Sequence, residues 1–221
     1  MKIHKEGYQI LTGWTIILLA INGFLFFIVG KSIFTYFILA ISIVLFLIVL
    51  NFFRSPNRIF QRNEKENVIV SPADGTIVVI EEVIETEHFN EKRMQVSIFM
   101  NLFNAHINWI PVDGKIIYHK HHSGRFMSAY LPKSSSENER SVVIIETASG
   151  EKILVKQIAG AIARRIVTYA KPGNSCRINE QLGFIKFGSR VDILLPLDSE
   201  ILIEMDQKIL GNKTVIAKLK E

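Results

Sequence analysis

Cysteine is almost missing from this chain, which has Cys176 as its single cysteine. One thiol cannot form an intrachain disulfide or a cysteine metal cluster, and this cysteine usage fits a reducing compartment. The sequence also lacks basic runs interleaved with aromatic residues, so we expect no nucleic-acid partner. Residues 54–221 carry 23 Lys and Arg against 20 Asp and Glu, a modest net charge of +3. This charge suits an anionic membrane surface or lipid substrate and equally an ordinary solvated surface.

Charged residues are missing from two long stretches near the N-terminus. Between Glu6 and Lys31 lie 24 uncharged residues, and between Lys31 and Arg54 lie 22 more. A helix of either length crosses a hydrocarbon core of about 30 Å. A cleaved signal peptide fits poorly, because a second apolar stretch follows at once and no small-residue cleavage site closes the first. The sequence predicts a transmembrane hairpin over residues 1–53, with helices at about 8–29 and 32–53.

The charges that flank the hairpin predict its orientation. Two lysines precede the first helix and Arg54, Arg58 and Arg62 follow the second, whereas the turn between the helices carries only Lys31. Because positive residues favour the cytoplasmic side, we expect both ends to be cytoplasmic. The sequence therefore predicts a protein of the cell membrane, with the domain of residues 54–221 on the cytoplasmic face.

The two apolar stretches have two alternative interpretations besides a hairpin that spans the membrane. Asn22 and Gly23 interrupt the first stretch, so a re-entrant hairpin that enters a single leaflet stays open. A pair of core helices in a soluble protein is disfavoured, because the run over residues 41–50 is apolar on every helical face. In either membrane arrangement, the remainder of the chain stays on the inner face.

Residues 54–221 have the pattern of β structure. Short runs rich in β-branched residues recur there, mostly bounded by Gly, Pro, Asn or Asp. These runs cover residues 68–70, 76–80, 94–100, 115–118, 141–146, 153–158, 191–195 and 200–204. Two of them follow a Pro-x-Asp-Gly sequence, at residues 72–75 and 111–114, which predicts a turn that leads into a strand. The fold class predicted is mainly β, with a β-sandwich or barrel-like domain.

Three polar clusters are candidates for chemistry. His106 follows an apolar alternation and suits either a structural hydrogen bond or proton transfer near neutral pH. The run His119–His122 contains a His-x-His pair, but no carboxylate stands at a matching spacing, so we expect no metal site. The run Glu137–Arg140 is typical of a solvated polar loop. For Asp113, in the second Pro-x-Asp-Gly turn, we prefer a structural role.

A Gly-Ser peptide stands at residues 188 and 189, near the C-terminus. By itself such a pair is most often a turn. It can also react with itself, because the hydroxyl of Ser189 can attack the carbonyl of Gly188 and convert the amide into an ester. Elimination and hydrolysis would then leave a pyruvoyl group on a new N-terminus. The dipeptide alone does not decide between these two interpretations.

Seven motifs occur in one order along the chain. They are Phe53-Arg-Ser-Pro-Asn-Arg58, Ser71-Pro-Ala-Asp-Gly75, Phe103-Asn-Ala-His106, Gly124-Arg-Phe126, Glu137-Asn-Glu-Arg140, the stretch Gln157–Ile166, and Phe187-Gly-Ser-Arg-Val-Asp192. The ordered set resembles the phosphatidylserine decarboxylase family in its short membrane-associated form. The resemblance covers nearly the whole chain, and its last motif looks like the self-cleavage site of that family.

The resemblance implies a pyruvoyl-dependent decarboxylase that is made as a proenzyme. Autocatalytic cleavage between Gly188 and Ser189 would give a large chain (1–188) and a small chain (189–221) that remain together as a heterodimer. Ser189 would become the covalent pyruvoyl cofactor and form a Schiff base with the amine of phosphatidylserine. Loss of carbon dioxide and protonation would then give phosphatidylethanolamine. The hairpin would keep the site beside the membrane lipid, and assembly into a homo-oligomer is left open.

The resemblance also implies roles for Asp74 in self-cleavage and for His106 in the protonation that follows decarboxylation. Longer members carry a second histidine three residues after the first, and this chain has Trp109 there. The base for Ser189 is therefore left open between His106 and Asp74, the latter acting through water or with a histidine of residues 119–122. Candidates to hold the lipid phosphate or the serine carboxylate are Lys115, Arg125, Arg140, Arg164 and Arg165.

A second class of function is a membrane-anchored, β-rich carrier or peptidase-like binding module without pyruvoyl chemistry. Such modules need a modifiable lysine on a hairpin tip, or a second metal motif with an upstream His and Asp, and the sequence shows neither convincingly. A third is an anchored β domain in which residues 188 and 189 only form a turn.

Overall fold

The computed structural model describes residues 2–61, 67–125, 127, 137–160, 165–186 and 189–220. The chain divides into two compact units, Met1–Asn57 and Arg58–Glu221.

The first unit is a helical hairpin. A short 3-10 helix, η1 (Lys5–Gly7), precedes α1 (Tyr8–Val29), and α2 (Ile33–Phe52) follows after a short turn. Ser32 and Thr35 form a capping box that satisfies backbone N–H groups at the start of α2. Both helices are long and apolar enough to cross a membrane. Most of their large apolar side chains are exposed, as expected for helices that face lipid.

Contacts at two places hold the hairpin together. Within it, Asn22 Nδ2 donates to Ser42 Oγ at 2.9 Å, so a buried polar pair joins the two helices. At the open end, β1 (Lys2–Ile3) pairs antiparallel with β2 (Arg54–Ser55). Because the two ends of the hairpin meet in one small sheet, they lie on the same side of any membrane that the helices cross. This is the arrangement that the flanking charges predict.

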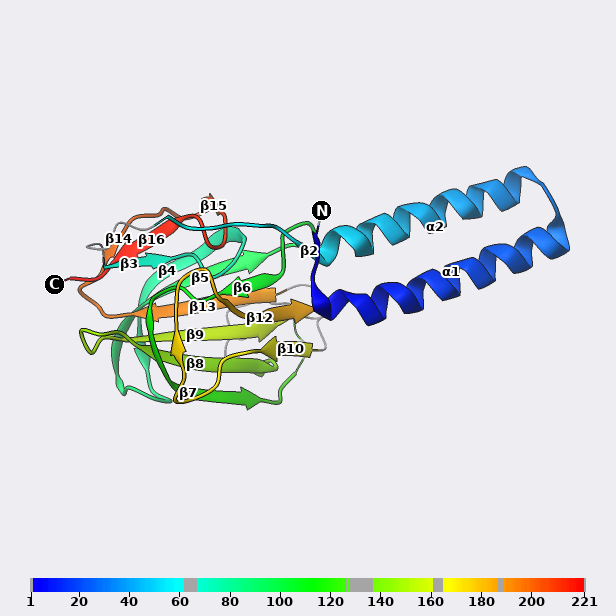
Figure 1. Ribbon diagram of the computed structural model, residues 1–221. Helices are drawn as coiled ribbons and strands as arrows, with labels where there is room; N and C mark the ends of the chain where they lie inside the picture. Colours follow the sequence, from blue (N-terminus) through cyan, green and yellow to red (C-terminus); the bar gives the residue numbers. More distant parts are fainter. Residues whose placement is uncertain are drawn as a thin grey trace. The chain divides into compact units, whose positions relative to one another are not determined.

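The described part of the second unit contains three antiparallel sheets (Figure 1). The largest has, in spatial order, β11 (Ser175–Cys176), β7 (Gly114–His122), β8 (Arg140–Glu146), β9 (Lys152–Ala159), β13 (Ser189–Leu195), β5 (Glu91–Met100), β4 (Gly75–Glu85) and β15 (Lys208–Ile209). The second has β10 (Arg165–Thr168), β12 (Gln181–Lys186) and β6 (Ile107–Trp109). The third has β14 (Glu200–Ile201), β16 (Val215–Lys218) and β3 (Val68–Val70).

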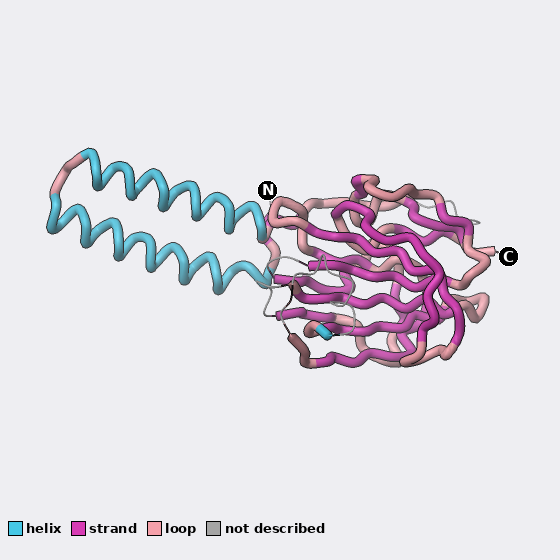
Figure 2. The backbone as a smooth tube through the Cα atoms, turned by 180° about the vertical axis from the view of Figure 1, so that it is seen from behind, coloured by secondary structure: helices cyan, strands magenta, loops and turns pink. Residues whose placement is uncertain are grey.

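The long strands of the largest sheet lie side by side and curve together, as Figure 2 shows. One face of this sheet meets the two smaller sheets across the main hydrophobic core. Representative core residues are Val143, Ile145, Val155 and Ile193 from the largest sheet, and Leu182, Ile185 and Ile216 from the smaller ones. The opposite face carries a second cluster made by Val142, Ile144, Leu154 and Leu194. The mainly β prediction, with a sandwich or barrel-like domain after a two-helix hairpin, is confirmed.

Both Pro-x-Asp-Gly sequences are turns that lead into strands, as predicted. β4 begins at Gly75 and β7 begins at Gly114. A Cβ atom would lie 2.3 Å from the carbonyl oxygen of Phe99 at the first glycine and 2.3 Å from that of Glu146 at the second. The neighbouring strand therefore passes too close for any side chain, which explains why glycine follows the aspartate in both turns.

A buried ion pair lies on β13. Since side chains alternate along a strand, Arg190 and Asp192 point away from the main core that holds Val191. Arg190 Nε donates to Asp192 Oδ1 at 2.5 Å, and Arg190 Nη2 donates to Ser97 Oγ at 2.9 Å. Arg190 is 2% exposed and Asp192 is fully buried. Each charge therefore depends on the other for compensation.

Replacing Asp192 with leucine should destabilise the second unit, because Arg190 would stay buried without its counter-ion. We expect the free energy of unfolding to fall by about 3–5 kcal/mol, measured by urea denaturation in detergent on chains that also carry Ser189→Ala and so stay uncleaved. The double variant Arg190→Met, Asp192→Leu removes both charges and should recover much of that loss. Equal losses in the single and the double variant would contradict a mutual dependence of the two charges.

Candidate functional site

Ser189 is the first residue of β13 and is fully buried. In the sheet it lies between Met100, the last residue of β5, and Ala159, the last residue of β9. Ser189 Oγ donates to Met100 Sδ at 3.1 Å. A thioether sulfur is a weak acceptor, so little hydrogen-bond energy is lost when the hydroxyl turns away from it towards a carbonyl carbon. Gly188, the other half of the predicted cleavage site, lies outside the described residues.

His106 immediately precedes β6 and is also fully buried. Its carbonyl oxygen accepts the N–H of Ile185 at 3.2 Å, near the end of β12 that leads to Ser189. His106 Nδ1 lies 3.0 Å from the carbonyl oxygen of Asn104. Since a carbonyl only accepts, Nδ1 carries the proton and the lone pair is on Nε2. His106 and Ser189 are thus both buried, and the backbone of His106 bonds to the strand that precedes Ser189 along the chain.

Asp74 lies in the turn before β4 and is 2% exposed. Its two carboxylate oxygens accept from the guanidinium of Arg58, and they also accept the N–H of Gly211 at 2.8 Å and the N–H of Ala105 at 3.3 Å. Four such bonds occupy the lone-pair positions that a base would use. Because Ala105 directly precedes His106, Asp74 holds the backbone of the histidine segment, which is the contact expected of a positioning residue.

Arg58 is a site residue whose role sequence reasoning missed. The sequence marked it only as a positive charge after the hairpin and as the last residue of a motif. In the structure it pairs with Asp74, donates to the carbonyl oxygen of Gly211 at 3.0 Å, and lies 5.6 Å from the ring centroid of Trp109. Trp109 stands at the position where longer family members carry a second histidine. Its ring contacts the guanidinium of Arg58, the cation that pairs with Asp74.

The candidates for anion binding are spread over the second unit. Arg165 lies opposite Lys186, the last residue of β12, which precedes Ser189 by three positions along the chain. Arg140 lies at the Ser189 end of the largest sheet, where it pairs with Ile158, and its guanidinium bonds to Glu87 at 3.0 Å. Three other candidates remain. Lys115 is at the opposite end of β7, Arg125 bonds to Glu137 at 3.3 Å in an exposed pair, and Arg164 lies outside the described residues.

The two histidines of the His-x-His pair bond to separate partners. His119 Nε2 lies 3.2 Å from Ser141 Oγ, and His121 Nε2 lies 3.4 Å from a carboxylate oxygen of Glu139. Burial lowers the pKa of His119, and the charge of His121 lowers it further. His119 is therefore the neutral imidazole near pH 7, and its bond to Ser141 is a bond between two uncharged groups.

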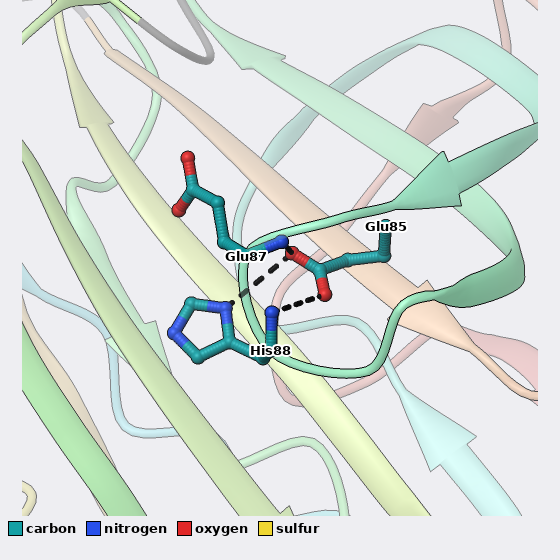
Figure 3. Close-up of side chains that lie close together, drawn as sticks. All are labelled: Glu85, Glu87 and His88. Carbon is teal, nitrogen blue, oxygen red and sulfur yellow. Dashed lines mark hydrogen bonds and ion pairs between the residues drawn. The ribbon is translucent and has the colours of Figure 1, made fainter.

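The part of the chain that the structure describes has one group of three side chains with metal-ligand atoms close together. Glu85, Glu87 and His88 bring such atoms within 4.8 Å of one another (Figure 3). The Glu85 carboxylate already accepts the N–H groups of His88 and Phe89, both at 2.8 Å. Burial raises the pKa of Glu85, but these bonds lower it more, so the net pKa lies below the ordinary value. The Glu85 carboxylate therefore stabilises the turn between β4 and β5.

Comparison with known proteins identifies the family of this chain. The family model described as phosphatidylserine decarboxylase matches residues 45–217. A protein of Parabacteroides distasonis is 57% identical over 221 residues, which cover 100% of both chains. Proteins of Phocaeicola vulgatus and Porphyromonas gingivalis are 53% and 50% identical, each over 100% of this chain and over 96% and 100% of their own length. All three are named phosphatidylserine decarboxylase proenzyme.

The fold and the site define an enzyme that has a buried serine at the start of a central β-strand and two membrane-type helices at its N-terminus. The chain belongs to the phosphatidylserine decarboxylase family, whose members are carboxy-lyases of phospholipid biosynthesis. Membership over the whole chain sets aside the carrier or peptidase-like module as an alternative.

Proposed function

We propose that this enzyme decarboxylates phosphatidylserine to phosphatidylethanolamine, using a pyruvoyl group formed from its own Ser189. The observation that carries the proposal is the position of Ser189, fully buried as the first residue of β13. The relatives are named proenzymes, which fits a maturation step. Cleavage between Gly188 and Ser189 is the maturation step that we propose.

The surroundings of Ser189 suit such a group. Ser189, Met100 and Ala159 are all fully buried, so a carbonyl formed there is shielded from water. A pyruvoyl group supplies an electrophilic carbonyl that takes up the electron pair released when carbon dioxide leaves the substrate amine. The side chains around it then have to bind the lipid head group and to hold or donate one proton.

His106 is the residue that we propose for proton transfer. Its Nε2 lone pair accepts the proton of Ser189 during self-cleavage, and the same nitrogen later protonates the carbon that has lost carbon dioxide. Asp74 is less suited to the first task, because its oxygens are engaged by Arg58 and by two backbone N–H groups. We therefore assign Asp74 and Arg58 to positioning the segment that contains His106.

Arg165 and Lys186 are the cations that we propose for binding the anionic head group. They are opposite each other on β10 and β12, and Lys186 precedes Ser189 by three positions along the chain. Two positive charges side by side suit a phosphate or a carboxylate. This places the recognition of negative charge at the strand ends where the reaction takes place.

The proposed large chain (1–188) and small chain (189–221) would remain together as a heterodimer. β13 would belong to the small chain and pairs along its length with β5 and β9 of the large chain. The hairpin of residues 1–53 would tie the domain of residues 54–221 to the cytoplasmic face of the cell membrane. The joint placement of both hairpin ends and the positive residues beside them supports this orientation.

The intact mass and gel pattern of the purified protein test the proposal. We expect two chains, the smaller being the 33 residues from position 189 to the C-terminus. Its N-terminus should be blocked to Edman sequencing, because a pyruvoyl group has no amine. Phosphatidylserine in mixed micelles should be converted to phosphatidylethanolamine with release of carbon dioxide. A stable, active, full-length single chain would contradict the proposal.

A further inference from the structure

A second side chain donates to the sulfur atom that Ser189 contacts. Asn108 Nδ2 lies 3.8 Å from Met100 Sδ, to which Ser189 Oγ donates at 3.1 Å. Asn108 is fully buried. Because a thioether sulfur is a weak acceptor, the carboxamide makes a poor bond in a place where water cannot replace it. The Asn108 N–H groups are therefore well placed for a stronger acceptor that appears beside Ser189.

A continuous hydrogen-bond network sets the orientation of the Asn108 carboxamide. Gln157 Nε2 donates to Asn108 Oδ1 at 2.8 Å, and Thr168 Oγ1 donates to Gln157 Oε1 at 2.7 Å. Ser141 Oγ lies 2.7 Å from Thr168 Oγ1, and His119 Nε2 lies 3.2 Å from Ser141 Oγ. Since the Thr168 hydrogen points to Gln157, Ser141 donates to Thr168 and His119 donates to Ser141. Every hydrogen in the network thus points towards Asn108, and its nitrogen is held on the side of the sulfur.

A glycine makes room for this network. Strands β6, β12 and β10 place Asn108, Gly183 and Thr168 side by side. A Cβ atom on Gly183 would lie 2.8 Å from Gln157 Nε2 and 2.1 Å from the carbonyl oxygen of Val167. Gln157 comes from β9 of the largest sheet. Its side chain lies over Gly183 and bonds to Asn108 on one side and Thr168 on the other. The network therefore joins two sheets at the point where the main chain leaves space for it.

We propose that Asn108 is a further catalytic residue of self-cleavage, donating from Nδ2 to the oxygen that becomes negative when Ser189 attacks the preceding carbonyl. In that step the bond from Ser189 Oγ to the carbonyl carbon forms, the bond from that carbon to the Ser189 nitrogen breaks, and the proton of Oγ ends on the nitrogen. The charged oxygen is two covalent bonds from the Ser189 nitrogen. A donor held in place before the reaction lowers the barrier.

Gln157 is a positioning residue in this proposal, since it acts through Asn108. The rest of the network fixes which end of the Gln157 amide faces Asn108, through Thr168, Ser141 and His119. The inference rests on the proposed pyruvoyl function, because it concerns the step that forms the pyruvoyl group.

The test follows self-cleavage of the full-length chain, made by cell-free synthesis with lipid vesicles and sampled over time by gel and mass. Asn108→Asp keeps an acceptor for Gln157 but has no N–H, and we expect it to slow cleavage about 10²–10³-fold. Asn108→Ala should slow it to a similar extent. Each change is also made together with Ser189→Ala, so that the melting temperatures of uncleaved proteins can be compared. Cleavage of Asn108→Asp at the wild-type rate would overturn the inference.

Gln157→Glu keeps the acceptor for Thr168 and removes the donor to Asn108, so it should slow cleavage less than Asn108→Ala does. In the double variant Asn108→Ala, Gln157→Glu, we expect no slowing beyond that of Asn108→Ala, because Gln157 would have nothing left to position. Additive slowing would show a separate, structural role. His121→Gln, on β7 but bonded to Glu139, is the matched control and should cleave normally.

The two proposals fail in distinguishable ways. If Ser189→Ala stays uncleaved while Asn108→Asp cleaves normally, the inference on Asn108 is wrong and the pyruvoyl function stands. If Ser189→Ala is still cut between residues 188 and 189, the pyruvoyl function itself is wrong.

Discussion

Replacing Ser189 with alanine is expected to leave the chain at full length and without decarboxylase activity. Alanine has no hydroxyl to attack the Gly188 carbonyl, so neither the ester nor the pyruvoyl group can form. Without that electrophile, turnover should fall to the uncatalysed rate, a loss of at least about a million-fold. The measurement combines intact mass with the release of carbon dioxide from phosphatidylserine.

The fold itself should tolerate this change. Ser189 gives one bond to a weak sulfur acceptor, and alanine keeps the β-strand geometry. The melting temperature of the uncleaved variant is therefore expected to stay close to that of a Ser199→Ala control, in which another buried serine, ten residues further along the chain, is changed. Decarboxylation by the Ser189→Ala protein would remove the pyruvoyl group from the mechanism.

Replacing His106 with alanine is expected to give the second largest loss. A positioned acid or base contributes about 10²–10⁴-fold, and the proposal gives His106 both proton transfers. Self-cleavage should slow, and the turnover of those chains that do cleave should fall within that range. Mass spectrometry measures the cleaved fraction, and turnover is then expressed per cleaved chain.

Separating the two steps makes the His106 result specific. Normal cleavage with lost turnover would restrict His106 to decarboxylation and require another base for Ser189. Unchanged cleavage and turnover would remove His106 from the site. His121→Ala is a suitable control, because the His121 side chain is exposed and bonds to Glu139.

The parts of the fold that follow local patterns could be predicted from the sequence. β3, β8 and β9 lie where β-branched runs occur, because those side chains are buried. β12 and β10 were not predicted. Gly183 interrupts the apolar run of β12, which pairs with β10 on one side and β6 on the other and packs on the main core. A strand whose stability comes from distant partners has no signature within its own few residues.

The candidate site also has residues that local motifs predict and contacts that they do not. Ser189, His106 and Asp74 could be named from the order of short motifs along the chain. The contact of Asp74 with Gly211 joins residues 137 positions apart, and the bond from Gln157 to Asn108 joins residues 49 apart. No local spacing encodes such contacts, since they arise only when the sheets pack. Arg58 had a weak signal as the end of a motif, but its pairing with Asp74 became visible only in the folded chain.

The central position of β13 bears on how the enzyme is assembled. After the proposed cut, a 33-residue fragment would still pair through β13 with β5 and β9, through β15 with β4 and through β16 with β3. Within one chain these strands meet at a high effective concentration, whereas two separate chains must find each other in solution. The protein therefore has to fold before it is cut. Denaturing the mature enzyme would release the fragment, and recovery would then depend on protein concentration, whereas refolding of the uncut chain would not.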